Sequence, residues 1–179
     1  VSVVCSSALN RSLLEFNITD TGQILDKVRE IVIETFQKSK EEVKDGMDIS
    51  LCCLNLATRE LLWSGANNPL WVIRNKTKSL ESFKPDKQPI GKSENPTPFY
   101  TNHILLEEGD CIYIFTDGYQ DQFGGEKGKK FMAAKMKEMF INNYENSMSE
   151  QKEIAFNAIQ NWKGQLEQVD DICVWGVKI

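Results

Sequence analysis

Acidic residues stand at the ends of two apolar segments, where their carboxylates could bind a cation. Asp117 and Gly118 directly follow the apolar run CIYIFT, and Asp170 and Asp171 directly precede the apolar run ICVWGV. Asp-Gly is a common turn dipeptide and aspartate is common in turns and at helix caps, so the two pairs can be independent turns or caps. Carboxylates gathered at one place would instead repel one another unless a cation lay between them. Hard oxygen ligands of this kind select Mg²⁺ or Mn²⁺.

The metal interpretation depends on how the two apolar segments pair. Asp117 ends one predicted strand, and Asp170 begins another 53 residues later (170 − 117 = 53). If these strands are antiparallel neighbours, the end of one and the start of the other fall at the same edge of the sheet. At least two carboxylates would then lie together. Spacing alone leaves the metal interpretation and the turn interpretation open.

The rest of the composition excludes several other kinds of function. His103 is the only histidine, which excludes a histidine-rich metal site and argues against a Ser-His-Asp triad. None of the five cysteines stands in a C-x-x-C pair, so we expect reduced thiols in a cytoplasmic protein. A net charge of −5 argues against a general nucleic-acid binder. No apolar run approaches the roughly 18–20 residues of a membrane span, and no signal-peptide pattern opens the chain.

Hydrophobic periodicity predicts the elements that hold these residues. Segments 1–16, 18–42, 127–144 and 147–166 have helical periodicity. Short segments rich in β-branched and aromatic residues predict strands at 49–56, 60–66 and 70–74, two within 101–118, and one at 171–179. Segment 83–99 holds four of the five prolines and is predicted to be a surface excursion. Because helices and strands do not alternate, we predict one α+β domain, residues 1–179, built on antiparallel sheet.

Five ordered blocks carry a resemblance that covers nearly the whole chain. They read KDGMDISLC, SGANNPLW, DKQPIG, GDCIYIFTDGYQDQFGG and LEQVDDICVWGV. In order and spacing they resemble the SpoIIE-type branch of the metal-dependent Ser/Thr protein phosphatases, the PPM family. In particular they are similar to the phosphatase domains that end large bacterial sensor proteins.

The resemblance implies a fold and a site. The fold would be two stacked antiparallel β-sheets flanked by helix pairs, an αββα sandwich. Asp117 and Asp170 would be ligands of a dinuclear Mg²⁺ or Mn²⁺ centre, which activates water for attack on phosphorus. Gly118, Asp171, Asp48 and Asp45 would support the centre. No side-chain nucleophile is then needed.

The resemblance also implies a signalling role. The substrate would be phosphoserine or phosphothreonine on a regulatory protein, such as an anti-sigma-factor antagonist in bacterial partner switching. Sensor domains would lie upstream in the parent chain. We expect no contact with nucleic acid and none with a membrane from this segment.

One departure from the family pattern bears on activity. The family begins with strands and an Asp-x-x-Gly-His-Gly stretch whose Asp bridges both metals, and nothing similar stands in these 179 residues. We therefore expect a domain without its first strands, with little or no activity by itself and a tendency to form homodimers through open sheet edges. The alternative is a non-catalytic, phosphatase-like module that binds a regulatory protein.

Overall fold

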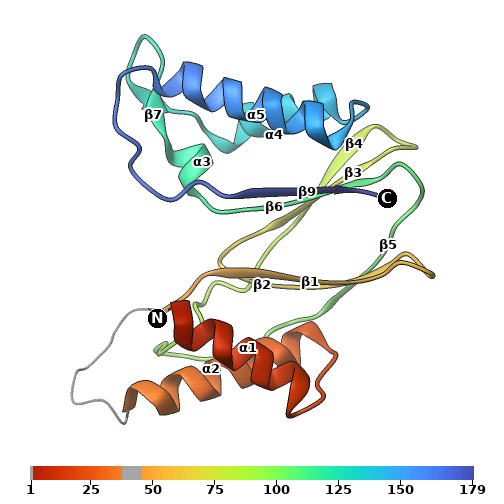
Figure 1. Cartoon of the computed structure of the whole chain (residues 1–179), viewed down its shortest axis with the longest axis vertical. Helices are drawn as coiled ribbons and strands as arrows, with labels where there is room; N and C mark the ends of the chain where they lie inside the picture. The colour runs from red at the N-terminus through yellow and green to blue at the C-terminus, as the bar shows by residue number, and fades with distance from the viewer. Residues whose placement is uncertain (1, 38–45) are drawn as a thin grey trace. The chain divides into compact units, whose positions relative to one another are not determined.

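The computed structural model describes residues 2–37 and 46–179, which fall into two compact units (Figure 1). The first unit comprises Val1–Pro69 and Lys84–Leu106, and the second comprises Leu70–Phe83 and Glu107–Ile179. Each unit combines helices with an antiparallel sheet, so the α+β prediction is confirmed. The prediction that residues 1–179 form a single domain stays a prediction.

The first unit packs a helix pair on a three-stranded sheet. Its helices are α1 (Ser2–Leu14) and α2 (Thr21–Gln37), and its sheet has the order β1-β2-β5. These strands are β1 (Ile49–Asn55), β2 (Glu60–Ala66) and β5 (Asn102–Leu105), and both pairings are antiparallel. Ile24, Leu25, Val28, Ile31 and Val32 of α2 are buried at helical spacing and form the core of this unit.

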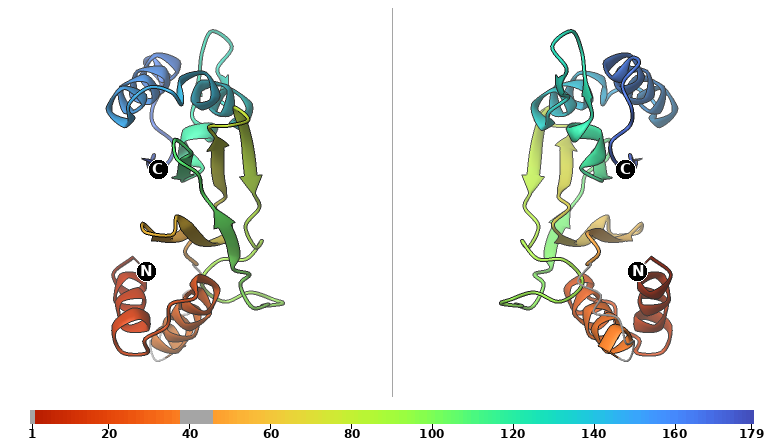
Figure 2. Two further views of the ribbon diagram at one scale, coloured as in Figure 1. Left: turned by 90° about the vertical axis from the view of Figure 1, so that its right-hand side faces the viewer. Right: turned by 90° about the vertical axis from the view of Figure 1, so that its left-hand side faces the viewer.

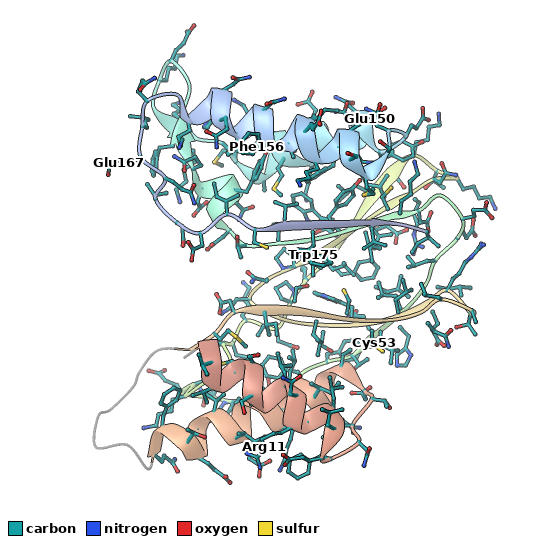
Figure 3. All side chains as sticks on the ribbon, viewed as in Figure 1. Arg11, Cys53, Glu150, Phe156, Glu167 and Trp175 are labelled. Atoms are coloured by element: carbon teal, nitrogen blue, oxygen red, sulfur yellow. The ribbon has the colours of Figure 1, made fainter. Side chains whose placement is uncertain are left out.

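The second unit packs helices on a four-stranded antiparallel sheet of order β4-β3-β6-β9. The strands are β3 (Leu70–Arg74), β4 (Ser79–Phe83), β6 (Cys111–Phe115) and β9 (Val174–Lys178). Helices α4 (Ala133–Asn143) and α5 (Met148–Lys163) lie on one face of this sheet in Figure 2. Ser147 and Glu150 form a reciprocal capping box that begins α5. The labelled Glu150 marks this end of α5 in Figure 3.

Three short elements of the second unit were missed by the sequence prediction. These are α3 (Gly118–Asp121), a single turn after β6, and the hairpin strands β7 (Phe123–Gly124) and β8 (Lys129–Lys130). The hairpin corrects the predicted helix 127–144, which begins only at Ala133. Gly125 and Gly128 have φ values of +67° and +56°, which suit the turn between β7 and β8. The predicted end of the second helix, residues 38–42, lies outside the described residues.

Candidate metal site

Strands β6 and β9 are antiparallel neighbours, as the metal interpretation requires. Phe115, the last residue of β6, pairs with Val174, the first residue of β9. Thr116 continues the pairing, because its backbone N–H donates to the Cys173 carbonyl oxygen at 3.0 Å. Its hydroxyl donates to the Asp171 carbonyl oxygen at 2.7 Å and accepts from the Cys173 backbone N–H at 3.0 Å. The turn at Asp117 and the acidic pair at Asp170 therefore share one edge of the sheet.

Gly118 brings the two acidic segments into backbone contact. A β-carbon at this position would stand 2.5 Å from the Asp171 carbonyl oxygen and 3.3 Å from the carbonyl carbon of Asp170. These separations are shorter than van der Waals contact, so only glycine allows the approach. Gly118 is buried, whereas Asp117, Asp170 and Asp171 are exposed. Gly118 therefore allows close packing between the two segments, and its role in supporting a metal centre stays a prediction.

The carboxylates at this edge keep oxygen atoms available for a ligand. Asp117 precedes α3 and makes no side-chain capping hydrogen bond, while its carbonyl oxygen accepts from the Asp121 N–H at 3.0 Å. One oxygen of Asp170, Oδ1, accepts from the backbone N–H of Asp171 at 2.7 Å. This bond orients the Asp170 carboxylate and leaves its second oxygen for another partner.

The donor set at this edge fits Mg²⁺ or Mn²⁺. Asp117 and Asp170 carry carboxylate oxygens, the type of ligand that these hard cations prefer, and their role as metal ligands stays a prediction. Among residues 2–37 and 46–179, no group of three or more His, Cys, Asp or Glu side chains comes together that could hold a metal ion. Magnesium is commonly held by only one or two carboxylates, because it keeps several of its waters and takes substrate phosphate oxygens. A two-carboxylate edge is therefore sufficient for one weakly held ion.

The other predicted supporting residues stand apart from this edge in the chain. Asp48 belongs to the first unit, where its Oδ1 accepts from the Asn67 side-chain amide at 2.8 Å. Asp45 lies outside the described residues. The roles assigned to both residues stay predictions.

Two polar residues that the sequence did not single out fasten the acidic loop, residues 164–171. Thr116 holds the end of this loop through the Asp171 carbonyl oxygen. Gln122, directly after α3, donates from its side-chain amide to the Glu167 carbonyl oxygen at 2.9 Å. The position of Thr116 directly before the Asp-Gly pair could have indicated from the sequence that Thr116 belongs to this site. No sequence pattern could have indicated the role of Gln122, because its partner Glu167 lies 45 residues away in sequence.

A mainly apolar cavity of the second unit has different chemistry. It measures about 580 Å³ and lies between α5 and the strands β6 and β9. Its lining is mainly apolar or aromatic, includes Tyr113, Tyr119, Phe140 and Ile159, and contains no carboxylate. Burial raises the pKa of the Tyr113 and Tyr119 hydroxyls above their ordinary value. The acidic edge, rather than this cavity, is the candidate site for a cation.

Comparison with known sequences identifies one protein family. The sequence profile described as Stage II sporulation protein E (SpoIIE) matches residues 3–179. No curated protein sequence matches the chain significantly. Within residues 2–37 and 46–179, no helix is both long enough and apolar enough to cross a membrane.

Comparison with solved structures identifies the fold. The SiaA-PP2C domain of Pseudomonas aeruginosa superposes with a TM-score of 0.87 at 20% identity, over 99% of this chain and 68% of that one. The PP2C phosphatase domain of SpoIIE from Bacillus subtilis, with a fragment of its regulatory domain, gives a TM-score of 0.73 at 15% identity. That match covers 98% of this chain but 48% of the other. The PPM Ser-Thr phosphatase MsPP from Mycobacterium smegmatis, in complex with cacodylate, gives 0.63 at 13% identity, over 100% of this chain and 82% of that one.

Proposed function

The chain belongs to the SpoIIE family, and on that premise we propose that it hydrolyses phosphoserine or phosphothreonine on a regulatory protein with bound Mg²⁺ or Mn²⁺. Its fold is that of the PPM phosphatases. The observation that carries the proposal is the meeting of Asp117-Gly118 with Asp170-Asp171 at one sheet edge. Two distant acidic segments are brought into backbone contact there, which independent turns would not require.

Each residue at this edge has a role in the proposed reaction. Asp117 and Asp170 would hold a divalent ion, and Asp171 and Gly118 keep the two segments together. Bound divalent ions supply charge neutralisation at the phosphoryl oxygens and activation of water. Thr116 fixes the Asp171 backbone, so that the carboxylates are in place before substrate arrives.

The substrate and partners are proposed by analogy with the relatives. A solved structure of the RsbU and RsbW domains of Rv1364c from Mycobacterium tuberculosis matches with a TM-score of 0.70 at 16% identity, over 97% of this chain and 45% of that one. We propose a phosphoprotein of such a regulatory system, for example an anti-sigma-factor antagonist, as the substrate. Sensor domains in the parent chain would control the reaction.

One observation favours a second candidate function. In the described part of the chain, the acidic edge has paired carboxylates but no group of three or more side chains that could hold a metal ion. A phosphatase-like module that binds a phosphoprotein without hydrolysing it would need no metal group larger than these paired carboxylates. The two functions differ in whether phosphate is released.

A phosphate-release assay separates the two functions. The chain is incubated with a phosphoserine peptide in millimolar Mn²⁺, and released phosphate is followed for the wild type, Asp117→Asn and Asp170→Asn. We expect slow, Mn²⁺-dependent release that both substitutions abolish. Glu126→Gln, which neutralises an exposed acid in the β7–β8 turn, is the matched control and keeps wild-type release. Peptide binding without any release would favour the non-catalytic module.

A further inference from the structure

Gln122 is a fully buried amide whose orientation is fixed by its surroundings. Its Nε2 donates to two carbonyl oxygens, that of Phe123 at 3.0 Å and that of Glu167 at 2.9 Å. The opposite orientation would place Oε1 against both carbonyl oxygens, where it could accept nothing. The amide must therefore point its NH₂ group toward the acidic loop.

This orientation leaves the other end of the amide without a partner. The Oε1 atom of Gln122 is buried and accepts no hydrogen bond from any residue that the structure describes. The side chain as a whole has no solvent exposure. A buried acceptor without a donor is unfavourable, and each instance in a folded protein calls for an explanation. Core packing alone would be served as well by an apolar side chain of the same size.

The bond to Glu167 is placed to control the acidic loop. Residues 164–171 are all exposed, and Figure 3 shows the labelled Glu167 on this connection between α5 and β9. Side chains from the α3 region hold the loop at two points, Gln122 at the Glu167 carbonyl and Thr116 at the Asp171 carbonyl. Asp170 lies between these two points in the chain. The backbone of Gln122 is held in turn, because its carbonyl oxygen accepts from Trp162 Nε1 at 3.1 Å and from the Phe131 N–H at 2.9 Å.

We propose that Gln122 is a positioning residue for the candidate metal site, which it serves by holding the loop so that Asp170 stays beside the Asp117-Gly118 turn. This inference rests on the proposed function, since it assigns a metal-related role to a residue that touches no metal. Residues that orient metal ligands commonly change metal affinity 10–100-fold when they are replaced. The unpaired Oε1 is then tolerated because the Nε2 bond fixes the loop.

The test uses the full chain and the substitution Gln122→Met, which keeps the size of the side chain and removes both the donor and the unpaired acceptor. Free Mn²⁺ is measured by electron paramagnetic resonance to obtain the dissociation constant, and unfolding of the metal-free protein is followed in urea. We expect Mn²⁺ binding weakened about 10–100-fold, with an unfolding midpoint equal to or above that of the wild type. Hydrogen exchange at the Leu166 and Asp171 amides should be faster in the variant without metal.

Gln151→Met is the matched control, because Gln151 is the other buried glutamine amide of the second unit. It bonds to the Tyr113 hydroxyl at 2.7 Å and to the carbonyl oxygens of Tyr144 and Asn146 at 3.1 and 3.0 Å, all outside the acidic loop. This substitution should lower the unfolding midpoint and leave the Mn²⁺ affinity unchanged. Gln122→Leu, which also removes the donor and the unpaired acceptor, should weaken Mn²⁺ binding as Gln122→Met does.

The outcomes separate the inference from the proposed function. If Asp170→Asn weakens Mn²⁺ binding but both Gln122 variants bind as the wild type does, the inference is wrong and the proposed site stands. The inference also fails if Gln122→Met lowers the unfolding midpoint as Gln151→Met does and leaves loop exchange unchanged, since Gln122 would then be a packing residue. If the wild type takes up no Mn²⁺, or Asp170→Asn binds it equally well, the proposed site fails and the inference fails with it.

Discussion

Gly118 lies so close to Asp171 that a β-carbon on residue 118 would stand 2.5 Å from the Asp171 carbonyl oxygen. The obstacle is backbone rather than the far end of a flexible side chain, so it cannot move aside without shifting the acidic loop. The contact joins the end of β6 to the start of β9 and thereby holds the candidate metal site together.

Gly118→Ala should separate the two acidic segments. We expect it to lower the free energy of unfolding by about 1–3 kcal/mol, as overpacking of a filled site does, and to weaken Mn²⁺ binding. The control is Gly128→Ala, since a β-carbon there meets nothing within 4 Å and only its φ of +56° opposes the change. Urea unfolding and Mn²⁺ titration measure both effects. Wild-type Mn²⁺ affinity in Gly118→Ala would show that the close contact is irrelevant to the site.

The buried ion pair between Arg74 and Asp110 should be the most sensitive charged pair of the second unit. The Asp110 side chain is 1% exposed, and it accepts from Arg74 at 2.9 Å and from the backbone N–H groups of Asn75 and Glu107. Asp110→Ala should cost about 3–5 kcal/mol, because it leaves a guanidinium without its buried partner. Glu81→Ala removes a 45% exposed partner of the same arginine and should cost about 1 kcal/mol or less. Equal losses in urea unfolding would contradict this assignment.

Alkaline pH should destabilise the fold through one half-buried thiol, Cys52, and two buried phenol groups. Burial, with a smaller effect of Cys53, raises the pKa of Cys52 from its ordinary value of 9.0 to about 12. Between these values the unfolded chain loses this proton while the folded chain keeps it, so stability present below pH 9 is lost as the pH rises toward 12. Burial also raises the pKa of Tyr113 and Tyr119, so these tyrosines lower the stability further at the upper end of this pH range. Cys52→Ala should reduce the loss measured by urea unfolding, whereas Cys173→Ala, at an exposed cysteine, should not.

The edge of β9 should promote self-association. In the four-stranded sheet β9 is an edge strand, and its Trp175 side chain is 65% exposed. Figure 3 labels this residue on β9. Exposed apolar edge strands pair with other chains, and a charge on the edge prevents it. Sedimentation at micromolar concentration should therefore find a dimer that Trp175→Lys converts to a monomer. A wild type that stays monomeric throughout would contradict the role of this edge.

The parts of the site that the sequence could predict are those encoded in local patterns. The apolar runs before Asp117 and after Asp171 predicted two strands, and their antiparallel pairing then placed both acids at one edge. The Gln122 anchor could not be predicted, because a hydrogen bond from a side chain to a backbone carbonyl 45 residues away leaves no periodicity in sequence. Strand β8 was mistaken for the start of a helix, and β7 was missed, because each strand has only two residues, too few to show an alternating pattern.

The central claim is that Asp117 and Asp170 bind the same divalent ion or pair of ions. The most direct test is an anomalous difference map from crystals of the chain soaked in Mn²⁺. We predict a manganese peak about 2.0–2.6 Å from a carboxylate oxygen of Asp117 and from one of Asp170, absent in Asp170→Asn. Manganese bound elsewhere, or an acidic edge that stays empty at saturating Mn²⁺, would contradict the claim.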